Sequence, residues 1–217
     1  MTEHRPGAGS DPEPAPTPPR IFLPHVVLPD FLPAADHRAL LTHALGNEDR
    51  FTPARVVGGV VDPAFRQALA WRDFGPLKTV LEQAILARMP ALFATLRIPA
   101  FDVDRLETEM VAHGDGAHFH MHMDVHPGKL GRYSDRRLST VYYFHRAPAG
   151  FSGGILRLHA LGAVNGDAGV DVAPAQNSLV AFPSMAPHEV TKVHCPSGAF
   201  ADSRFAINCW VYRAPEG

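Results

Sequence analysis

From about residue 104 onward, apolar and polar residues alternate in a series of short segments. Alternation of this kind is typical of strands that bury one face, because successive side chains point to opposite sides of a sheet. Turn-forming residues separate the segments, for example at Gly114-Asp115-Gly116 and Pro196-Ser197-Gly198. The predicted strands are 104–112, 117–123, 137–145, 154–160, 169–173, 178–182, 188–194 and 203–212. Consecutive short strands favour two sheets packed as a jelly roll.

The preceding part of the chain carries helical periodicity instead. Apolar residues form one stripe over residues 33–46, and a second stripe begins at Leu77. We expect this second helix to end at Pro90, since a proline inside a helix removes a hydrogen bond and clashes with the preceding turn. Residues 91–96 would then form a short third helix.

Together these patterns predict a mostly β fold with N-terminal helices, in which a double-stranded β-helix (jelly-roll) barrel is buttressed by helices. The barrel would occupy residues 104–213 and the helical support residues 21–103 of a single domain, residues 21–217. Residues 1–20 are rich in proline and poor in apolar side chains, so we expect a disordered tail there.

Composition narrows the possible partners. A formal net charge of −2 offers no electrostatic basis for binding nucleic acid or an anionic membrane. No apolar run approaches the roughly 18 residues of a membrane span, and the N-terminus lacks the pattern of a secretory signal. The cysteines, Cys195 and Cys209, are too few for a disulfide framework. We therefore expect a cytoplasmic protein without a nucleic-acid or membrane partner; the sequence leaves its oligomeric state open.

The chemistry-bearing residues begin with a His-x-Asp pair, His122 and Asp124, and His188 follows much later. Two imidazoles and one carboxylate on one face of an octahedron form the facial triad of non-haem Fe(II) oxygenases. Three protein ligands leave three metal positions, which a keto acid and oxygen can fill. Arg204, on the last predicted strand, is the kind of residue that would anchor a dicarboxylate co-substrate. This set predicts an enzyme that activates oxygen.

Strand parity places some of these side chains. In 203–212, Arg204 shares one side with Asn208 and Trp210, while the other side is apolar and suits packing under the helices. Arg204 should therefore point into the barrel. In 137–145, parity puts Tyr143 on one face but does not decide which face is the inner one.

The same residues admit other interpretations. The tract 118–126, rich in histidine and methionine, could instead bind copper or nickel. A single His-x-Asp pair is common by chance, and His188 could be an ordinary strand histidine. Arg204 could close a surface ion pair, which would contribute little, and Tyr143 could be core packing.

From about residue 104 to 213, the chain resembles the prolyl 4-hydroxylase-type 2-oxoglutarate/Fe(II) dioxygenases, including bacterial members and the hypoxia-sensing prolyl hydroxylases. The motifs that carry the resemblance are His122-Met-Asp124, Arg137-Leu-Ser-Thr-Val-Tyr-Tyr143, Ser152-Gly-Gly-Ile-Leu-Arg-Leu158, His188-Glu-Val and Arg204-Phe-Ala-Ile-Asn-Cys-Trp210. Their combination is specific, and together they cover about half of the chain.

The resemblance implies a catalytic centre in which His122, Asp124 and His188 bind Fe(II). Arg204 would pair with the distal carboxylate of 2-oxoglutarate, and Tyr143 would donate a hydrogen bond to it, which selects the Tyr143 face as the inner one. With 2-oxoglutarate and O2 as co-substrates, the expected reaction is hydroxylation of an unactivated C–H bond with release of succinate and CO2.

Three further residues are expected around the co-substrate on the same ground. Leu156 would line its slot, Trp210 would form the barrel floor, and Asn208 would assist at the same carboxylate. The substrate implied is a prolyl, amino-acyl or peptide-like compound, with small molecules and free amino acids open as alternatives. The loop 126–136 and the segment 48–75 are expected to rim the entrance.

The chain departs from the family pattern at several positions. The collagen-type enzymes have Lys where this chain has Arg204, and the segment Cys195–Ala201 is an insertion. Many relatives have Tyr ahead of the metal motif, where this chain has His113 or Ala112. No role is assigned to four other residues, His118, His120, His126 and Arg137.

Two alternatives to a hydroxylase stay open. The first uses the same cofactors but ends in demethylation, desaturation or cyclisation of a natural-product intermediate. The second is a catalytically inactive metal-binding scaffold, against which the intact triad and Arg204 argue. Asp124 argues against a halogenase, which typically gives up this carboxylate so that halide can bind the metal.

Overall fold

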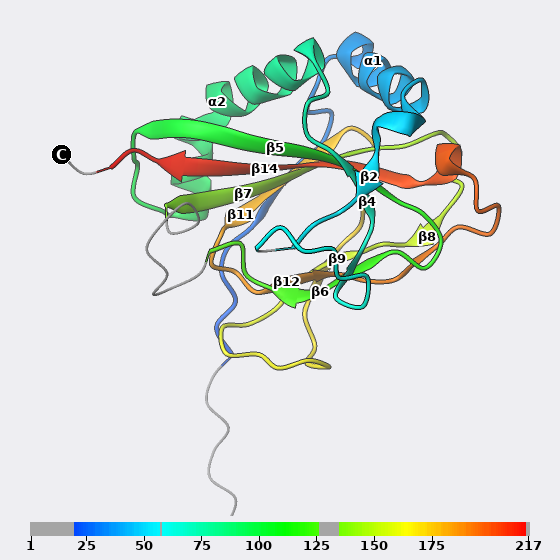
Figure 1. Cartoon of the computed structure of the whole chain (residues 1–217). Coiled ribbons are helices and arrows are strands. Elements are labelled where there is room, and N and C mark those ends of the chain that lie inside the picture. Colours follow the sequence, from blue (N-terminus) through cyan, green and yellow to red (C-terminus); the bar gives the residue numbers. More distant parts are fainter. Residues whose placement is uncertain (1–19, 57, 126–134, 216–217) are drawn as a thin grey trace, which may run out of the picture.

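The computed structural model describes residues 20–56, 58–125 and 135–215. Antiparallel strands dominate it, as predicted, and they form two sheets that face one another with two helices beyond the larger sheet (Figure 1). This mostly β architecture is consistent with the predicted jelly roll. The predicted tail, residues 1–20, lies outside the described residues except for Arg20.

The larger sheet has seven strands, and its central strand, β14, pairs with β7 on one side and β5 on the other. Its strands, in spatial order, are β1 (Val26–Leu28), β11 (Ser178–Pro183), β7 (Arg136–Phe144), β14 (Arg204–Arg213), β5 (Val103–His113), β4 (Leu69–Trp71) and β2 (Thr52–Pro53).

The smaller sheet has five strands and carries two of the three predicted metal ligands. Its spatial order is β10 (Val170–Val172), β9 (Leu156–Leu158), β12 (His188–Val190), β6 (His118–His122) and β3 (Arg66–Gln67). A separate pair is formed by β8 (Ser152–Gly153) and β13 (Val193–His194), and short 3-10 turns lie at Glu48–Arg50 and Phe200–Asp202. The predicted strand 188–194 is instead two short strands, β12 and β13, and the pairing of β12 with β6 is irregular between His188 and Val190.

Two helices, α1 (Ala34–Leu45) and α2 (Pro76–Leu96), pack on the outer face of the larger sheet (Figure 1). The prediction that Pro90 ends the second helix was wrong, because α2 continues through it to Leu96. Pro90 itself is exposed, whereas Met89 and Leu92 on either side of it are buried in the core. Packing of this apolar stripe outweighs the missing hydrogen bond.

The parity of β14 is confirmed. Phe205, Ile207, Cys209 and Val211 belong to the core between the helices and the larger sheet. Ala206, from the opposite face, belongs to the core between the two sheets, together with Tyr143 of β7 and Leu156 of β9. Tyr143 therefore lies on the inner face of its strand.

Strands β1 to β4 were not predicted. Each is two or three residues long, which is too short for alternation to stand out. They extend both sheets, and β3 places Arg66 beside the metal motif by pairing with β6. No helix in the described ranges has the length and hydropathy needed to cross a membrane.

Candidate active site

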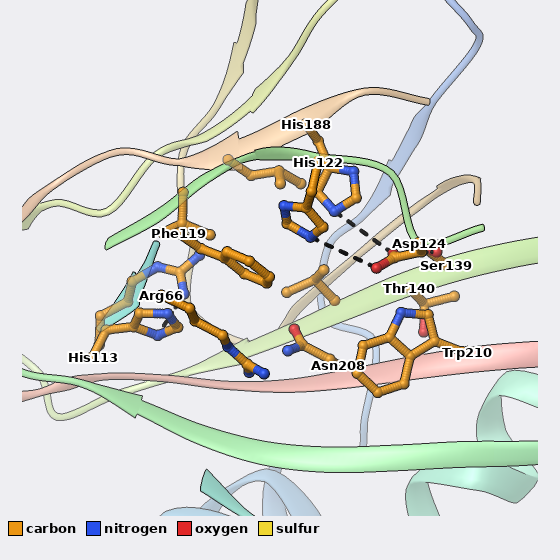
Figure 2. Close-up of a pocket in the computed structure, with 14 residues that line it drawn as sticks. Arg66, His113, Phe119, His122, Asp124, Ser139, Thr140, His188, Asn208 and Trp210 are labelled. Atoms are coloured by element: carbon orange, nitrogen blue, oxygen red, sulfur yellow. Dashed lines mark hydrogen bonds and ion pairs between the residues drawn. The ribbon is translucent and has the colours of Figure 1, made fainter. Parts of the chain in front are cut away.

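The structure brings His122, Asp124 and His188 together. His122 ends β6 and His188 begins β12, and these two residues face one another in the antiparallel ladder. Asp124 follows β6 directly, and its backbone N–H donates to the carbonyl of Ser184 over 3.0 Å. One ligand atom from each side chain lies within 4.8 Å of the other two, which no other set of three potential ligands among the described residues achieves. Figure 2 shows both imidazoles directed at the Asp124 carboxylate.

Hydrogen bonds to the backbone fix both imidazole tautomers. His122 Nδ1 lies 2.8 Å from the His120 carbonyl, and His188 Nδ1 lies 2.9 Å from the Ala186 carbonyl. Because a carbonyl oxygen only accepts, each Nδ1 carries the proton and each Nε2 keeps a free lone pair. The Nε2 atoms lie 3.7 Å and 3.6 Å from the two Asp124 carboxylate oxygens. Outer hydrogen bonds of this kind are typical of metal-binding histidines.

The electrostatics keep the ligands in the forms that bind a metal. Burial, together with the neighbouring His188, lowers the pKa of His122 to about 3, so its imidazole is neutral near pH 7. Burial opposes ionisation of Asp124, but the two histidines and the hydroxyl of Ser139 outweigh it and hold the pKa of this carboxyl below its ordinary value. Ser139 Oγ donates to Asp124 Oδ2 over 2.6 Å.

Aromatic rings hold the two imidazoles in place. The ring of Phe119 stacks on His122, with centroids 3.6 Å apart and planes inclined by 20°. Phe182 contacts His188 edge-on, with centroids 4.8 Å apart. Both rings also limit the access of water to the ligands, which strengthens electrostatic interactions at the centre.

A buried arginine lies in the same cavity. Arg204, at the start of β14, is 1% exposed, and its guanidinium carbon lies 4.8 Å from the centroid of the Tyr143 ring. By hydrogen-bond geometry, the buried Arg204 Nε and Nη2 and the Tyr143 hydroxyl have no partner among the described residues. Since buried donors in folded proteins are almost always satisfied, these atoms indicate a site built for a ligand with several acceptor oxygens.

Gly154, in the Ser152-Gly-Gly motif, makes room for this arginine. A Cβ atom there would lie 2.6 Å from Arg204 Cδ and 2.9 Å from Val193 Cγ2. The backbone of Gly154 also has a φ of +61°, which favours glycine. This position therefore has both a steric and a conformational reason for glycine.

Four of the five residues predicted to surround the co-substrate line one cavity. Leu156, Asn208, Trp210 and Arg204 line the cavity that also contains the three metal-ligand candidates. Tyr143 is buried between the sheets and meets the cavity through Arg204. The guanidinium carbon of Arg136 lies 4.2 Å from the centroid of the Trp210 indole, a cation–π contact that helps to orient this ring.

Three cavity residues, His113, Arg66 and Ser139, were not predicted as site residues. His113 ends β5 and lies opposite Arg204 in the ladder, and Arg204 Nη1 donates to its Nδ1 over 3.3 Å. His113, not Ala112, is thus the residue beside the site. Arg66 is 5% exposed, and its guanidinium carbon lies 4.9 Å from the centroid of the Phe119 ring. Ser139 could have been predicted, because it lies on the same face of β7 as Tyr143, and that face points inward.

Other positions singled out in the sequence lie away from the cavity. His118 and His120 have ring centroids 4.9 Å apart, but no third described ligand joins them. His118 contacts two backbone carbonyls instead, those of Gly116 and Ala64. His126 and most of the loop 126–136 lie outside the described residues.

The residues present fit a facial Fe(II) centre with a dicarboxylate beside it. Two neutral imidazoles and a carboxylate suit ferrous iron, and the unpaired N–H and O–H groups of Arg204 and Tyr143 suit a carboxylate. The pattern of the 2OG-Fe(II) oxygenase superfamily matches residues 108–212, which include all three ligand candidates and Arg204. Residues 108–212 thus match the superfamily whose chemistry this site suits.

The chain is similar to one protein that is named as a hydroxylase. An uncharacterised PKHD-type hydroxylase of Synechocystis sp. is 29% identical over 198 residues, which cover 88% of this chain and 64% of the relative. The chain thus spans less than two thirds of that protein. Enzymes of this superfamily use Fe(II), 2-oxoglutarate and O2.

Solved structures show the same fold. A prolyl hydroxylase of Trichoplax adhaerens, in complex with a hypoxia-inducible factor peptide fragment, has a TM-score of 0.66 at 17% identity and covers 87% of this chain and 83% of its own. A prolyl-4-hydroxylase of Pseudomonas putida has a TM-score of 0.64 at 24% identity and covers 87% and 92%.

Proposed function

We propose that this 2OG-Fe(II) oxygenase hydroxylates an unactivated C–H bond and converts 2-oxoglutarate to succinate and CO2. The observation that carries the proposal is the convergence of His122, Asp124 and His188 in one cavity with Arg204. The buried Nε–H and Nη2–H groups of this arginine have no hydrogen-bond partner in the described part of the chain. The triad would hold the metal and Arg204 would hold the anionic co-substrate, and this reaction requires both.

His122, Asp124 and His188 would hold the iron. Bound Fe(II), together with 2-oxoglutarate and O2, supplies the oxidising chemistry. The chain supplies the ligand geometry: the carbonyls of His120 and Ala186 hold the protons on Nδ1, so that both Nε2 lone pairs face the centre. Ser139 holds the Asp124 carboxylate at its Oδ2 atom.

Arg204 and Tyr143 would hold the distal carboxylate of 2-oxoglutarate. The guanidinium presents two unpaired nitrogens and the phenol a third donor, and all three are buried. Burial raises the pKa of Tyr143, which keeps its hydroxyl protonated and able to donate. Asn208 adds a polar group on the same face of β14, and Leu156 and Trp210 line the cavity around it.

His113 would add a fourth donor. Since Arg204 Nη1 donates to His113 Nδ1, a neutral His113 carries its proton on Nε2. That atom is buried and has no hydrogen-bond partner within the described ranges. The sequence resemblance puts His113 or Ala112 where many relatives have tyrosine, and His113 can supply the hydrogen bond that a tyrosine hydroxyl would supply.

The relatives favour a prolyl or other amino-acyl substrate, either in a peptide or as a free molecule. Demethylation, desaturation and cyclisation would need the same cofactors, so product analysis has to separate them. Residues 21–217 act as one domain in this proposal, because segments before and after residue 104 share both sheets. Both cysteines are free and buried, which supports a reducing compartment such as the cytoplasm.

The test is a coupled assay on the purified, Fe(II)-loaded protein. Succinate is measured with and without candidate peptides and amino acids, and mass spectrometry follows the gain of one oxygen in the substrate. We expect succinate formation to require iron, O2 and 2-oxoglutarate together, and to stop in Asp124→Ala. Iron-loaded protein that neither binds nor consumes 2-oxoglutarate would instead favour the inactive scaffold.

A further inference from the structure

A second cavity, which we call the arginine mouth, opens onto the candidate metal centre. It shares Arg66, Phe119, His122, Asp124 and Trp210 with the co-substrate cavity. Its remaining walls are Arg55, Val56, Arg72, Met123 and Arg136. A substrate that approaches the metal ligands from this side therefore passes four guanidinium groups.

Among the described residues, two glutamates form ion pairs with arginines of the mouth. Arg66 pairs with Glu109 at 2.5 Å and Arg136 pairs with Glu107 at 3.0 Å. Arg72 bridges both glutamates, at 2.7 Å from Glu107 and 3.1 Å from Glu109. Burial opposes ionisation of Glu107, but hydrogen bonds from Tyr212 and Arg136 outweigh it and lower its pKa to about 2. Arg66, Arg72 and Arg136 thus each pair with Glu107 or Glu109.

Arg55 is the remaining arginine of the mouth. Its side chain is exposed, Nη1 donates to the carbonyl of Gly59 over 2.6 Å, and it has no carboxylate partner within the described residues. A contiguous groove leads outward from it along β2 and β4, past Trp71, Gly58 and Gly59. Arg50 stands on this groove, with its guanidinium carbon 6.0 Å from the Trp71 ring centroid, and it too has no ion pair in the described ranges.

This charge has no role in the chemistry assigned above. The co-substrate carboxylate is held at the other side of the cavity by Arg204, and the metal is held by the triad. A neutral or cationic substrate would leave Arg55 unused or would be repelled. A carboxylate receives charge-assisted hydrogen bonds from a guanidinium, which are about twice as strong as neutral ones.

We propose that the substrate carries a carboxylate that binds Arg55, beside Arg72, while the carbon to be oxidised faces the metal centre. The inference rests on the proposed function and names the substrate class of the same site. Two sources share this chemistry: an aspartate or glutamate side chain near the oxidised residue of a peptide, and a free acidic amino acid.

The test compares matched acidic and neutral substrates on the Fe(II)-loaded enzyme with 2-oxoglutarate. One arm uses proline-centred peptide libraries in which Glu or Gln, and Asp or Asn, flank the central residue. The other arm uses free glutamate, aspartate, proline and their amide or neutral counterparts. Mass spectrometry identifies the oxidised members, and kcat/KM is measured for each matched pair at low and high salt.

We expect kcat/KM for the acidic member to exceed that of its amide by about tenfold, mainly through KM, which corresponds to about 1.4 kcal/mol. The preference should shrink at high salt, because the mouth is open to solvent. Arg55→Glu should abolish it and favour a Lys-containing peptide, with 2-oxoglutarate affinity unchanged. Arg88→Glu, the same charge reversal on the exposed side of α2, should keep the wild-type preference.

Equal kcat/KM for acidic and neutral members, or an Arg55→Glu variant with the wild-type preference, overturns the inference. The inference is also overturned if the enzyme consumes 2-oxoglutarate without substrate but oxidises none of the peptides or amino acids in either arm. Failure of the proposed function gives a different result, since the wild-type protein would then not bind 2-oxoglutarate at all.

Discussion

His113 Nδ1 lies 3.3 Å from Nη1 of Arg204, and the two residues are direct partners in the β5–β14 ladder. A guanidinium only donates, so this contact makes Nδ1 the acceptor and leaves the ring proton on Nε2. Because no described residue accepts a hydrogen bond from the buried Nε2, the two side chains form one continuous donor surface on the co-substrate cavity.

Replacement of His113 by leucine should weaken 2-oxoglutarate binding by roughly tenfold to a hundredfold, since hydrogen bonds to a charged group contribute about 1.5–3 kcal/mol. Calorimetric titration of the oxygen-free, Fe(II)-loaded variant measures this. His113→Gln, which can accept from Arg204 and still donate, should recover most of the loss. Equal affinities in wild type and His113→Leu would show that His113 does not touch the co-substrate.

His113 should also make stability depend on pH. Burial, together with the charges of Arg204 and Arg66, holds the pKa of His113 well below its ordinary value. In the unfolded chain the group titrates near pH 6.5, at about its reference value. Below that pH the unfolded state binds a proton that the folded state does not, so stability is lost as the pH falls through this range.

The contribution of His113 to the slope of the free energy of unfolding against pH should approach about 1.4 kcal/mol per pH unit. Urea denaturation of metal-free wild type and His113→Gln between about pH 5 and 7.5 isolates the contribution of His113 to the pH dependence of stability. The other histidines are common to both proteins, so their contributions cancel. The free energy of unfolding should fall less steeply toward low pH in the variant. Parallel curves would mean that folded His113 takes up a proton as readily as the unfolded chain.

Ser139 should matter for metal affinity through Asp124. Its hydroxyl donates to the Oδ2 atom of that carboxylate, and loss of such an outer hydrogen bond typically costs about 10–100-fold in affinity. Titration of the Ser139→Ala apoprotein with a divalent metal should show this loss. Ser178→Ala is the matched control, since Ser178 is equally buried but donates to the carbonyl of Ala175. A similar loss in both variants would assign the effect to general destabilisation.

Pro90→Ala should stabilise the fold. Pro90 is exposed in the interior of α2 and lacks the N–H that would reach the carbonyl of Leu86. Alanine is about 3 kcal/mol more favourable than proline in a helix interior. Loss of the proline also gives the unfolded chain more conformational freedom, which lowers the stability by about 1 kcal/mol. We expect a net gain of roughly 1–2 kcal/mol and a rise in Tm of about 2–8 °C. A lower Tm would show that the proline ring packs favourably where it lies.

The inner face of β14 was predictable because a two-residue period sorts side chains without any tertiary information. Arg204, Asn208 and Trp210 were assigned to the cavity in this way, and the structure places them there. The metal-ligand candidates were predictable for a different reason: their spacing belongs to a motif, and the β6–β12 ladder brings its two halves together.

The remaining cavity residues depend on pairings that no local pattern contains. His113 becomes a site residue only through its register with Arg204, and Arg66 only through a two-residue strand that pairs with β6. The course of α2 through Pro90 was missed for a related reason. A local rule for proline competes there with the burial of Met89 and Leu92, and tertiary packing decides the outcome.

The most direct test of this account is a calorimetric titration of 2-oxoglutarate into the oxygen-free, Fe(II)-loaded protein, with Arg204→Ala and Tyr143→Phe beside the wild type. One molecule should bind per chain, and the affinity should fall by roughly a hundredfold or more in Arg204→Ala, because a broken buried charge pair costs about 3–5 kcal/mol. Tyr143→Phe should lose less, since it removes one hydrogen bond and little shape. Binding of equal strength in wild type and Arg204→Ala, or no binding in either, would contradict the assignment of this cavity to 2-oxoglutarate.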